Sequence, residues 1–479
     1  MRLLRFARND NYLFGQSPST MHAKFEIRFI WLALALAVFS GFAIGAHVAS
    51  VIGLDLPLGK GFYSFIQAHG HVQLVGWAGL FIIGISLHFI PRLAGVPLQN
   101  PARIDLILVL ISTGLLLRSI GQTTLPYLTG STAFNPISLL VVFSGLIEMA
   151  GILLYLMTLV QTILSVGNTD VRPALQSVKP FFLMMATGWF LYAVFNFALL
   201  LHMTFTENVV VDQNWNEFAV QIFLNMVLLP VAFAFSVRMF PLYLRLPAID
   251  WPVNKIAVTY LAGVGLHLLP TLPVVLSLPT QIPFYVSGAG KILKAAVILW
   301  FILKLDLLTR RRDPWIVHRI LHPGLERRPT RDGLPDYGEF GHFEWLVYAA
   351  YIWLVIAVTL ELLTGVAALL SWGVPISSDA IRHAYLLGFV TNLILGMAVR
   401  MIPGFIKKKA VAHPKLVAAT FWLGNAAALS RILPLLLPAD WLEIYPVTIV
   451  ISLRAFALSG IFGIAAIICL AINLVKTAK

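Results

Sequence analysis

Long apolar segments recur along the 479-residue chain, separated by short polar or basic connections. Each is about 20 residues or longer, which is the length that spans a bilayer as a helix. The segments are continuous and do not alternate at every second residue, so they do not indicate a membrane β-barrel. The pattern predicts an all-α integral membrane protein with twelve spans. Their approximate ranges are 25–52, 63–90, 103–125, 135–166, 176–204, 217–243, 254–278, 282–308, 342–370, 378–402, 412–436 and 442–475.

The composition supports this fold class. Hydrophobic residues make up 59% of the chain and charged residues only 11%, and the mean hydropathy is +0.86. Soluble domains carry about 25% charged residues. We therefore expect residues 25–479 to form a single transmembrane domain. The preceding segment, 1–24, is polar and basic and lacks the apolar core of a cleavable signal peptide.

The formal net charge of +13 is unevenly distributed along the chain. Basic residues gather in the N-terminal segment, in the loop 309–341 and in the sequence IKKKA at 406–410. Connections that would lie on the other side are neutral or acidic, as in TENVVVDQNWNE at 206–217. This positive-inside pattern predicts that both termini and the loop 309–341 are cytoplasmic. The charge then indicates contact with anionic lipid, not with nucleic acid.

Three of the predicted spans resemble one another. HVQLVGWAGLFIIGISLHFIP (71–91) matches HAYLLGFVTNLILGMAVRMIP (383–403) without a gap, and QIFLNMVLLPVAFAFSVRMFP (221–241) is a weaker third copy. Apolar helices that end in Arg and Pro can also look alike by chance, and this alternative is stronger for the third copy. Because the copies fall on the second, sixth and tenth spans, the repeat predicts three groups of four helices around a pseudo-threefold axis.

The repeat gives two histidines an equivalent place. His71 and His383 begin their copies and lie at similar depth, where they could occupy both axial positions of a haem. His69 points to nearly the opposite side of the same helix, so it either serves a second site or takes the role of His71. Cys469 is the only cysteine, so any haem is held non-covalently, as a b-type haem is. The glycines at 76, 84, 388 and 396 would let a flat ring or a neighbouring helix approach closely.

Other polar residues within the spans are candidates for the same centre. A copper site could use His47, His69 or His202, because imidazole suits copper, although each alone is also typical of an interfacial histidine. Arg118 and Arg431 are candidate partners of haem propionates, and Glu148 and Glu361 are the alternative partners of these arginines. Glu148, Glu361 and Asn225 could line a proton path, but they are too scattered in sequence to trace one.

The motifs AHGHVQLVGW, VRMFP and RHAYLLGFVTNLILGMAVRMIPGF resemble the NnrS family. This resemblance implies a twelve-helix protein of the bacterial inner membrane that binds haem and copper and is associated with tolerance of nitric oxide. The family's second helix typically reads HAHEM. Here His69 and His71 match, but Val72 and Gln73 replace Glu and Met, and GFIKKK replaces the family's GHTGR-like ending after the tenth span.

The layout also resembles the catalytic subunit of haem-copper oxidases and nitric oxide reductases. There, twelve helices form three arcs of four, and histidines on the second and tenth hold the low-spin haem. His71 or His69, and His383, match those places. The second histidine that the superfamily needs on the tenth helix is absent, since Ile381 and Tyr385 stand at the neighbouring positions. The sixth span has no histidine and the seventh only His267, so dioxygen reduction at the usual binuclear centre is not expected.

Three functional hypotheses follow from these observations. The leading one is a haem-binding or haem-copper membrane protein that acts in nitric oxide response or in electron transfer. The second is a divergent terminal oxidase or nitric oxide reductase, an oxidoreductase with an open coordination position. The third is a cofactor-free transporter, because internal repeats are common in transporters. The partners expected under the first two are the bilayer, nitric oxide or another small diatomic ligand, and an electron donor protein or quinol.

Overall fold

The computed structural model describes residues 25–166, 173–312, 331, 334–373, 376–437 and 446–479. These residues form helices joined by turns and short loops and contain no strand. Eleven helices are long and apolar enough to cross a membrane. The predicted segment 1–24 and most of the basic loop 309–341 lie outside the described residues.

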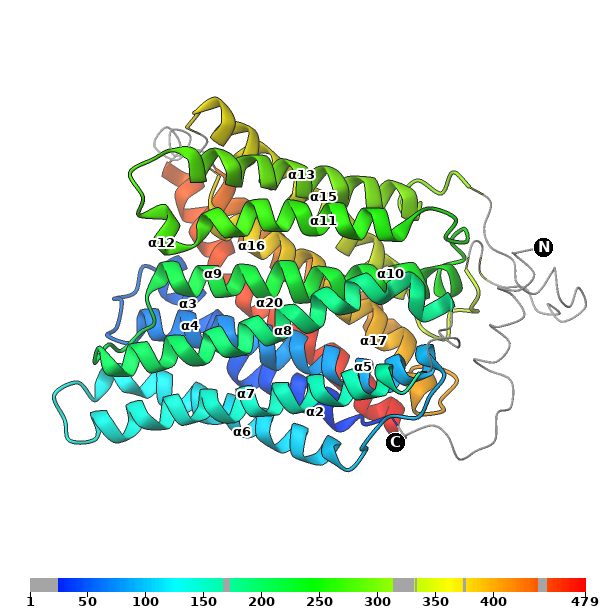
Figure 1. Ribbon diagram of the computed structural model, residues 1–479, viewed down its shortest axis with the longest axis horizontal. Coiled ribbons are helices and arrows are strands. Elements are labelled where there is room, and N and C mark those ends of the chain that lie inside the picture. The colour runs from blue at the N-terminus through cyan, green and yellow to red at the C-terminus, as the bar shows by residue number, and fades with distance from the viewer. Residues whose placement is uncertain (1–24, 167–172, 313–330, 332–333, 374–375, 438–445) are drawn as a thin grey trace, which may run out of the picture.

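The helices follow the predicted spans in order (Figure 1). Four spans are interrupted by π-helical segments, and three end in a 3₁₀ turn. The first six spans are α2–η2–α3 (Arg28–Leu36, Ala37–Phe42, Ala43–Gly53), α4–η3–α5 (Phe62–His71, Val72–Gly79, Leu80–Ala94), α6–η4 (Arg103–Thr124, Leu125–Tyr127), α7 (Phe134–Leu164), α8 (Pro173–Phe205) and α9–η5–α10 (Gln213–Phe223, Leu224–Leu228, Leu229–Tyr243). The others are α11–η6 (Val253–Leu268, Leu269–Thr271), α13 (Ile282–Leu305), α15 (Phe343–Leu370), α16–η7–α17 (Ser378–His383, Ala384–Thr391, Asn392–Phe405), α18–η8 (Pro414–Ile432, Leu433–Leu436) and α20 (Pro446–Ala478).

The seventh span is shorter than predicted. The sequence predicts a helix over 254–278, but α11 ends at Leu268 and is followed by the turn η6 and the short helix α12 (Pro273–Leu276). Pro270 and Pro273 explain the break, because proline has no N–H for the helical hydrogen bond and clashes with the preceding turn. α11, with 16 residues, is not among the eleven candidate membrane helices.

The three repeat copies form the inner part of the bundle. The most apolar stretches of the second, sixth and tenth spans are 83%, 72% and 78% buried, whereas no other candidate span exceeds 50%. Each copy contains a π-helical segment, and η3 and η7 begin directly after His71 and His383 at the same repeat position. The copies also end alike, with Pro91, Pro241 and Pro403 inside their last turns. The predicted repeat is therefore visible in the backbone as well as in the sequence.

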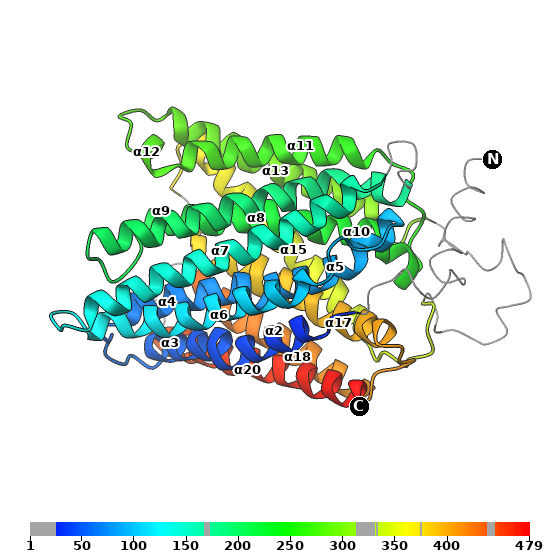
Figure 2. The same ribbon diagram turned by 60° about the horizontal axis from the view of Figure 1, so that its bottom comes forward.

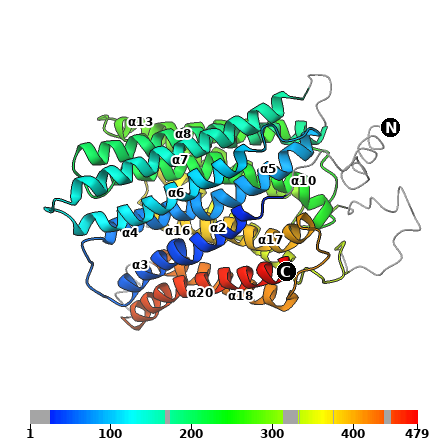
Figure 3. The same ribbon diagram turned by 90° about the horizontal axis from the view of Figure 1, so that it is seen from below.

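The outer helices contact one another in sequence around this inner set. Contacts join α6 with α7, α7 with α8, α11 with α13, α13 with α15 and α18 with α20. Between the two ends of the chain, α20 packs along α3, as Figures 2 and 3 show. The C-terminus lies at the same end of the bundle as the ends of α5, α10 and α17 (Figure 1). That this end faces the cytoplasm stays a prediction.

The glycines of the repeat meet neighbouring helices. A Cβ on Gly84 would lie 2.9 Å from Cβ of Phe29, and one on Gly388 would lie 2.8 Å from Cβ of Trp353. Of the two roles predicted for these glycines, the structure shows close helix packing.

Closure of the bundle depends on a similar contact at Gly460. A Cβ there would lie 2.3 Å from Cα of Ala46 on α3. We expect Gly460→Leu to separate α20 from α3 and to lower the free energy of unfolding by about 2 kcal/mol or more. Thermal unfolding of the purified protein measures this. Gly265→Leu is the matched control, since a Cβ at Gly265 meets nothing within 4 Å. Equal stability of the two variants would contradict the prediction.

Candidate haem site

His69 lies on α4 and faces the first span. Its Nδ1 is 2.7 Å from the carbonyl oxygen of Gly41, and its ring packs where a Cβ on Gly45 would otherwise stand, 2.5 Å from Cε1. The side chain is only partly buried. Because a carbonyl can only accept, Nδ1 carries the proton and Nε2 keeps the lone pair.

His383 shows the same arrangement on α16. Its Nδ1 is 2.8 Å from the carbonyl oxygen of Asp379, one turn earlier, and 3.4 Å from the Asp379 carboxylate. Within the described residues, no side chain or backbone group bonds Nε2 of either His69 or His383, and neither atom is fully enclosed. Metal-binding histidines typically donate their other ring N–H to a carbonyl or carboxylate in this way. Both rings are therefore held in the tautomer that can ligate a metal through Nε2.

Arg431 connects the surroundings of these two histidines. One guanidinium nitrogen lies 3.6 Å from the Asp379 carboxylate, and the guanidinium stacks 4.0 Å from the ring centroid of Phe456. His69 is close enough to His383, Asp379 and Arg431 to interact electrostatically with each of them. We call these four residues (His69, His383, Asp379 and Arg431) the histidine pair site.

A second cation, Arg382, adds to the site. It lies 2.8 Å from Asp379 and also pairs with Glu217 on α9. The Asp379 carboxylate is thus surrounded by Arg382, Arg431 and His383, which offset the cost of its partial burial.

The residues of the histidine pair site fit a haem. Two imidazoles with open Nε2 atoms come from different spans, and Nε of Arg431 is buried without a hydrogen-bond partner among the described residues. A propionate would supply the acceptor that this N–H lacks. A haem held by two histidines in this way would suit electron transfer.

His71 belongs to a different group. Its Nε2 lies 2.8 Å from the Glu148 carboxylate on α7, and its Nδ1 lies 3.0 Å from the Tyr192 hydroxyl on α8. His71 and Glu148 are both almost completely buried. Both ring nitrogens of His71 are therefore engaged by protein partners, and the ring lies between the second, fourth and fifth spans.

Arg118 completes this group, because it interacts electrostatically with Glu148 and Tyr192. We call these residues (His71, Glu148, Tyr192 and Arg118) the His71 group. Its guanidinium donates to Gln122 at 2.7 Å and to Asn196 at 3.0 Å. No carboxylate of the described residues lies within 4 Å of it. The two arginines that the sequence suggests for propionates thus lie in different groups, with Arg431 beside the histidine pair and Arg118 beside His71.

A third polar cluster contains a residue that the sequence analysis missed. Lys294 on α13 is fully buried and lies 2.7 Å from Glu361 on α15 and 2.6 Å from the side-chain oxygen of Asn225 on η5. Tyr385 on η7 donates to the other Glu361 oxygen at 2.6 Å, and Nδ1 of His267 lies 3.4 Å from the Lys294 ammonium. This lysine cluster (Lys294, Glu361, Asn225, His267 and Tyr385) joins five spans. Its signal in the sequence is a lysine in the apolar stretch KILKAAVILW at 291–300.

The lysine cluster brings together two of the three residues predicted for a proton path. Glu361 and Asn225, which looked scattered in sequence, share Lys294 as a partner. Glu148 lies apart from them, in the His71 group.

The remaining copper candidates lie at exposed positions. His47 contacts the ring of Phe65, and both His47 and His202 are exposed. In the described part of the chain, no three His, Cys, Asp or Glu side chains converge as metal ligands. These residues therefore do not fit a three-ligand copper site.

No family model and no curated protein matches the sequence. A solved structure does: a heme-copper terminal oxidase dimer determined by cryo-EM has a TM-score of 0.67 and 14% sequence identity over 94% of this chain and 83% of the oxidase chain. At this identity the likeness concerns the fold alone, and the NnrS resemblance stays a prediction. The chain is thus an all-helical, multi-pass membrane protein with a fold similar to that of haem-copper oxidase subunit I.

Proposed function

We propose that this protein binds a b-type haem between His69 and His383 and acts in electron transfer or nitric oxide response at the bacterial inner membrane. The observation that carries the proposal is the shared state of the two rings, each with Nδ1 on a backbone carbonyl and Nε2 open. The proposal takes His69 in place of His71, because both ring nitrogens of His71 already have protein partners.

The chain's own residues would prepare this site. The carbonyls of Gly41 and Asp379 hold the Nδ1 protons and so present two neutral imidazoles. Arg431 would offset the charge of a propionate through its unpaired Nε–H. When bound, the haem supplies a one-electron redox centre. The nitric oxide role is supported by the NnrS-like motifs of the three repeat spans.

Electron transfer is favoured over dioxygen reduction. Among the described residues, no three His, Cys, Asp or Glu side chains converge to hold a copper ion, and the lysine cluster joins the sixth to tenth spans with an ion pair and its hydrogen bonds. We derive no catalytic step through copper.

A reduced-minus-oxidised absorbance spectrum of the purified protein tests the proposal. We expect the sharp bands of a low-spin b-type haem, with no shift when carbon monoxide is added, because His69 and His383 would both hold the iron and leave it no open position for carbon monoxide. A carbon monoxide-induced shift would instead favour an oxidase or nitric oxide reductase. A colourless protein, after expression with ample haem supply, would overturn the proposal in favour of a transporter.

A further inference from the structure

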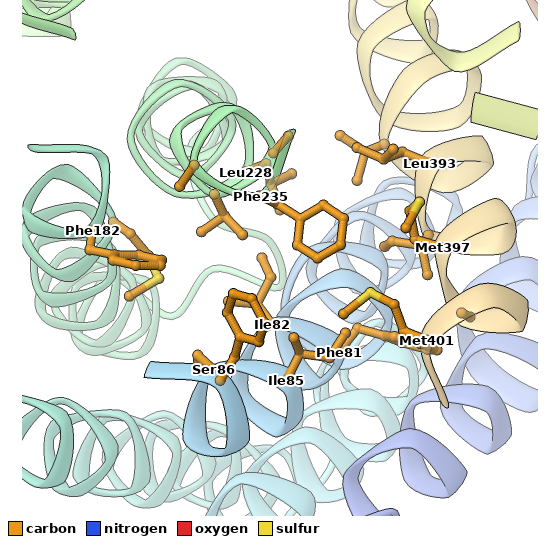
Figure 4. A pocket seen from close by; sticks show the side chains of 18 of the residues that line it. Phe81, Ile82, Ile85, Ser86, Phe182, Leu228, Phe235, Leu393, Met397 and Met401 are labelled. Atoms are coloured by element: carbon orange, nitrogen blue, oxygen red, sulfur yellow. The ribbon is translucent and has the colours of Figure 1, made fainter. Parts of the chain in front are cut away.

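The three repeat copies, together with α8, line a half-open chamber in the inner part of the bundle. It has a volume of about 110 Å³ and lies between α5, α8, α10 and the tenth span (Figure 4). Lining residues from the three copies occupy equivalent positions of the repeat. Two such sets are Phe81, Val231 and Leu393, and Ile85, Phe235 and Met397. The chamber therefore surrounds the pseudo-threefold axis, and one repeated helix face builds most of its wall.

The wall of the chamber has no free hydrogen-bonding side chain that could bind water. Ser86 is the one polar side chain that lines the chamber, and its hydroxyl already donates to the carbonyl of Ile83 at 3.0 Å and pairs with the Tyr155 hydroxyl at 2.8 Å. A water molecule in a cavity needs about two to four polar partners, and apolar cavities of about 150 Å³ stay dry and take up benzene or xenon. The chamber is accordingly suited to an apolar occupant.

We infer that the central chamber binds small apolar molecules that dissolve in the bilayer, of the size of a diatomic gas, xenon or at most benzene. Its volume and dry wall fit this class, and the phenylalanine and methionine side chains supply polarizable contact surface. Charged and strongly hydrated ligands are excluded, because no group in the wall could replace their hydration. The inference goes beyond the proposed haem function and does not depend on it.

Crystals of the full-length protein pressurised with xenon test this inference. In the wild type we expect an anomalous peak between Ile85, Phe235 and Met397. Ala232→Phe should abolish the peak, because Ala232 lines the chamber and the larger ring fills it. Ala262→Phe adds the same volume at an exposed position on α11 and should leave the peak unchanged.

A second variant keeps the test decisive if Ala232→Phe does not fold. Phe235→Leu enlarges the chamber, so xenon occupancy at the same pressure should rise above the wild-type value. The inference is overturned by ordered water in the wild-type chamber, by the absence of a wild-type peak, or by a peak that Ala232→Phe leaves in place. The haem spectrum of the same preparation is read separately, so failure of one proposal does not imply failure of the other.

Discussion

Replacing His69 or His383 with alanine is expected to abolish the haem spectrum of the purified protein. Each substitution removes one of the two Nε2 atoms that the structure leaves open. Loss of an outer-shell partner typically lowers metal affinity by roughly 10–100-fold, and loss of a ligand should cost more. The measurement is the haem content per protein and the reduced-minus-oxidised spectrum after purification.

Two further histidines serve as controls for this experiment. His47→Ala alters an exposed position and should leave the spectrum unchanged. His71→Ala should keep both haem bands while lowering stability, because it leaves Glu148 buried without its 2.8 Å partner. If His71→Ala loses the haem and His69→Ala retains it, His71 and not His69 would hold the haem, and our assignment is wrong.

Removing one partner of the Lys294–Glu361 ion pair is expected to destabilise the protein by roughly 3–5 kcal/mol. Lys294→Met leaves the Glu361 carboxylate buried with Tyr385 and His267 but without its ammonium partner, and Glu361→Leu leaves the ammonium without a carboxylate. An uncompensated charge in a fully buried site retains the whole cost of desolvation. Thermal unfolding of each variant in the same detergent measures the loss.

The double variant Lys294→Met/Glu361→Leu should recover most of this loss. Replacement of a buried ion pair by apolar residues of similar volume is often close to neutral. The exposed pair Arg312–Asp250, with a nitrogen–oxygen distance of 3.0 Å, provides the matched control and should contribute about 0–1 kcal/mol. Additive losses in the double variant would show that the two charges do not interact as the structure indicates.

Most of the fold was predictable because the apolar segments are long and the spans follow one another without large insertions. The candidate spans begin and end within a few residues of the predicted ranges. The seventh span was predicted too long, since the sequence LLPTLP continues the apolar run except for Thr271, and its prolines end the helix. The repeat on the second, sixth and tenth spans was predictable from sequence, but the inner place of these spans became visible only in the structure.

The candidate site was less predictable, because sequence spacing does not determine which way a side chain points around a helix. His69 and His71 are both plausible ligands by spacing, and only the contacts with Gly41 and Glu148 separate them. Lys294 was missed since its polar partners come from the sixth, seventh and ninth spans. Pairing across such distances becomes visible only once the helices are packed. Whether His69, His71, His383, Arg118 and Arg431 bind a cofactor stays a prediction.

The π-helical segments of the three repeat spans carry a consequence for where the chain could tolerate a deletion. A π segment arises when a helix accommodates an additional residue, which rotates everything beyond it by about 100° relative to a regular helix. η3 and η7 cover the same positions of the repeat and η5 lies within the matching stretch, so the two halves of each inner span are rotated against each other at the same level of the repeat. Deleting a single residue from η7 would accordingly rotate α16 relative to α17 and turn His383 away from His69. The identities of the residues that contact His383 would stay the same.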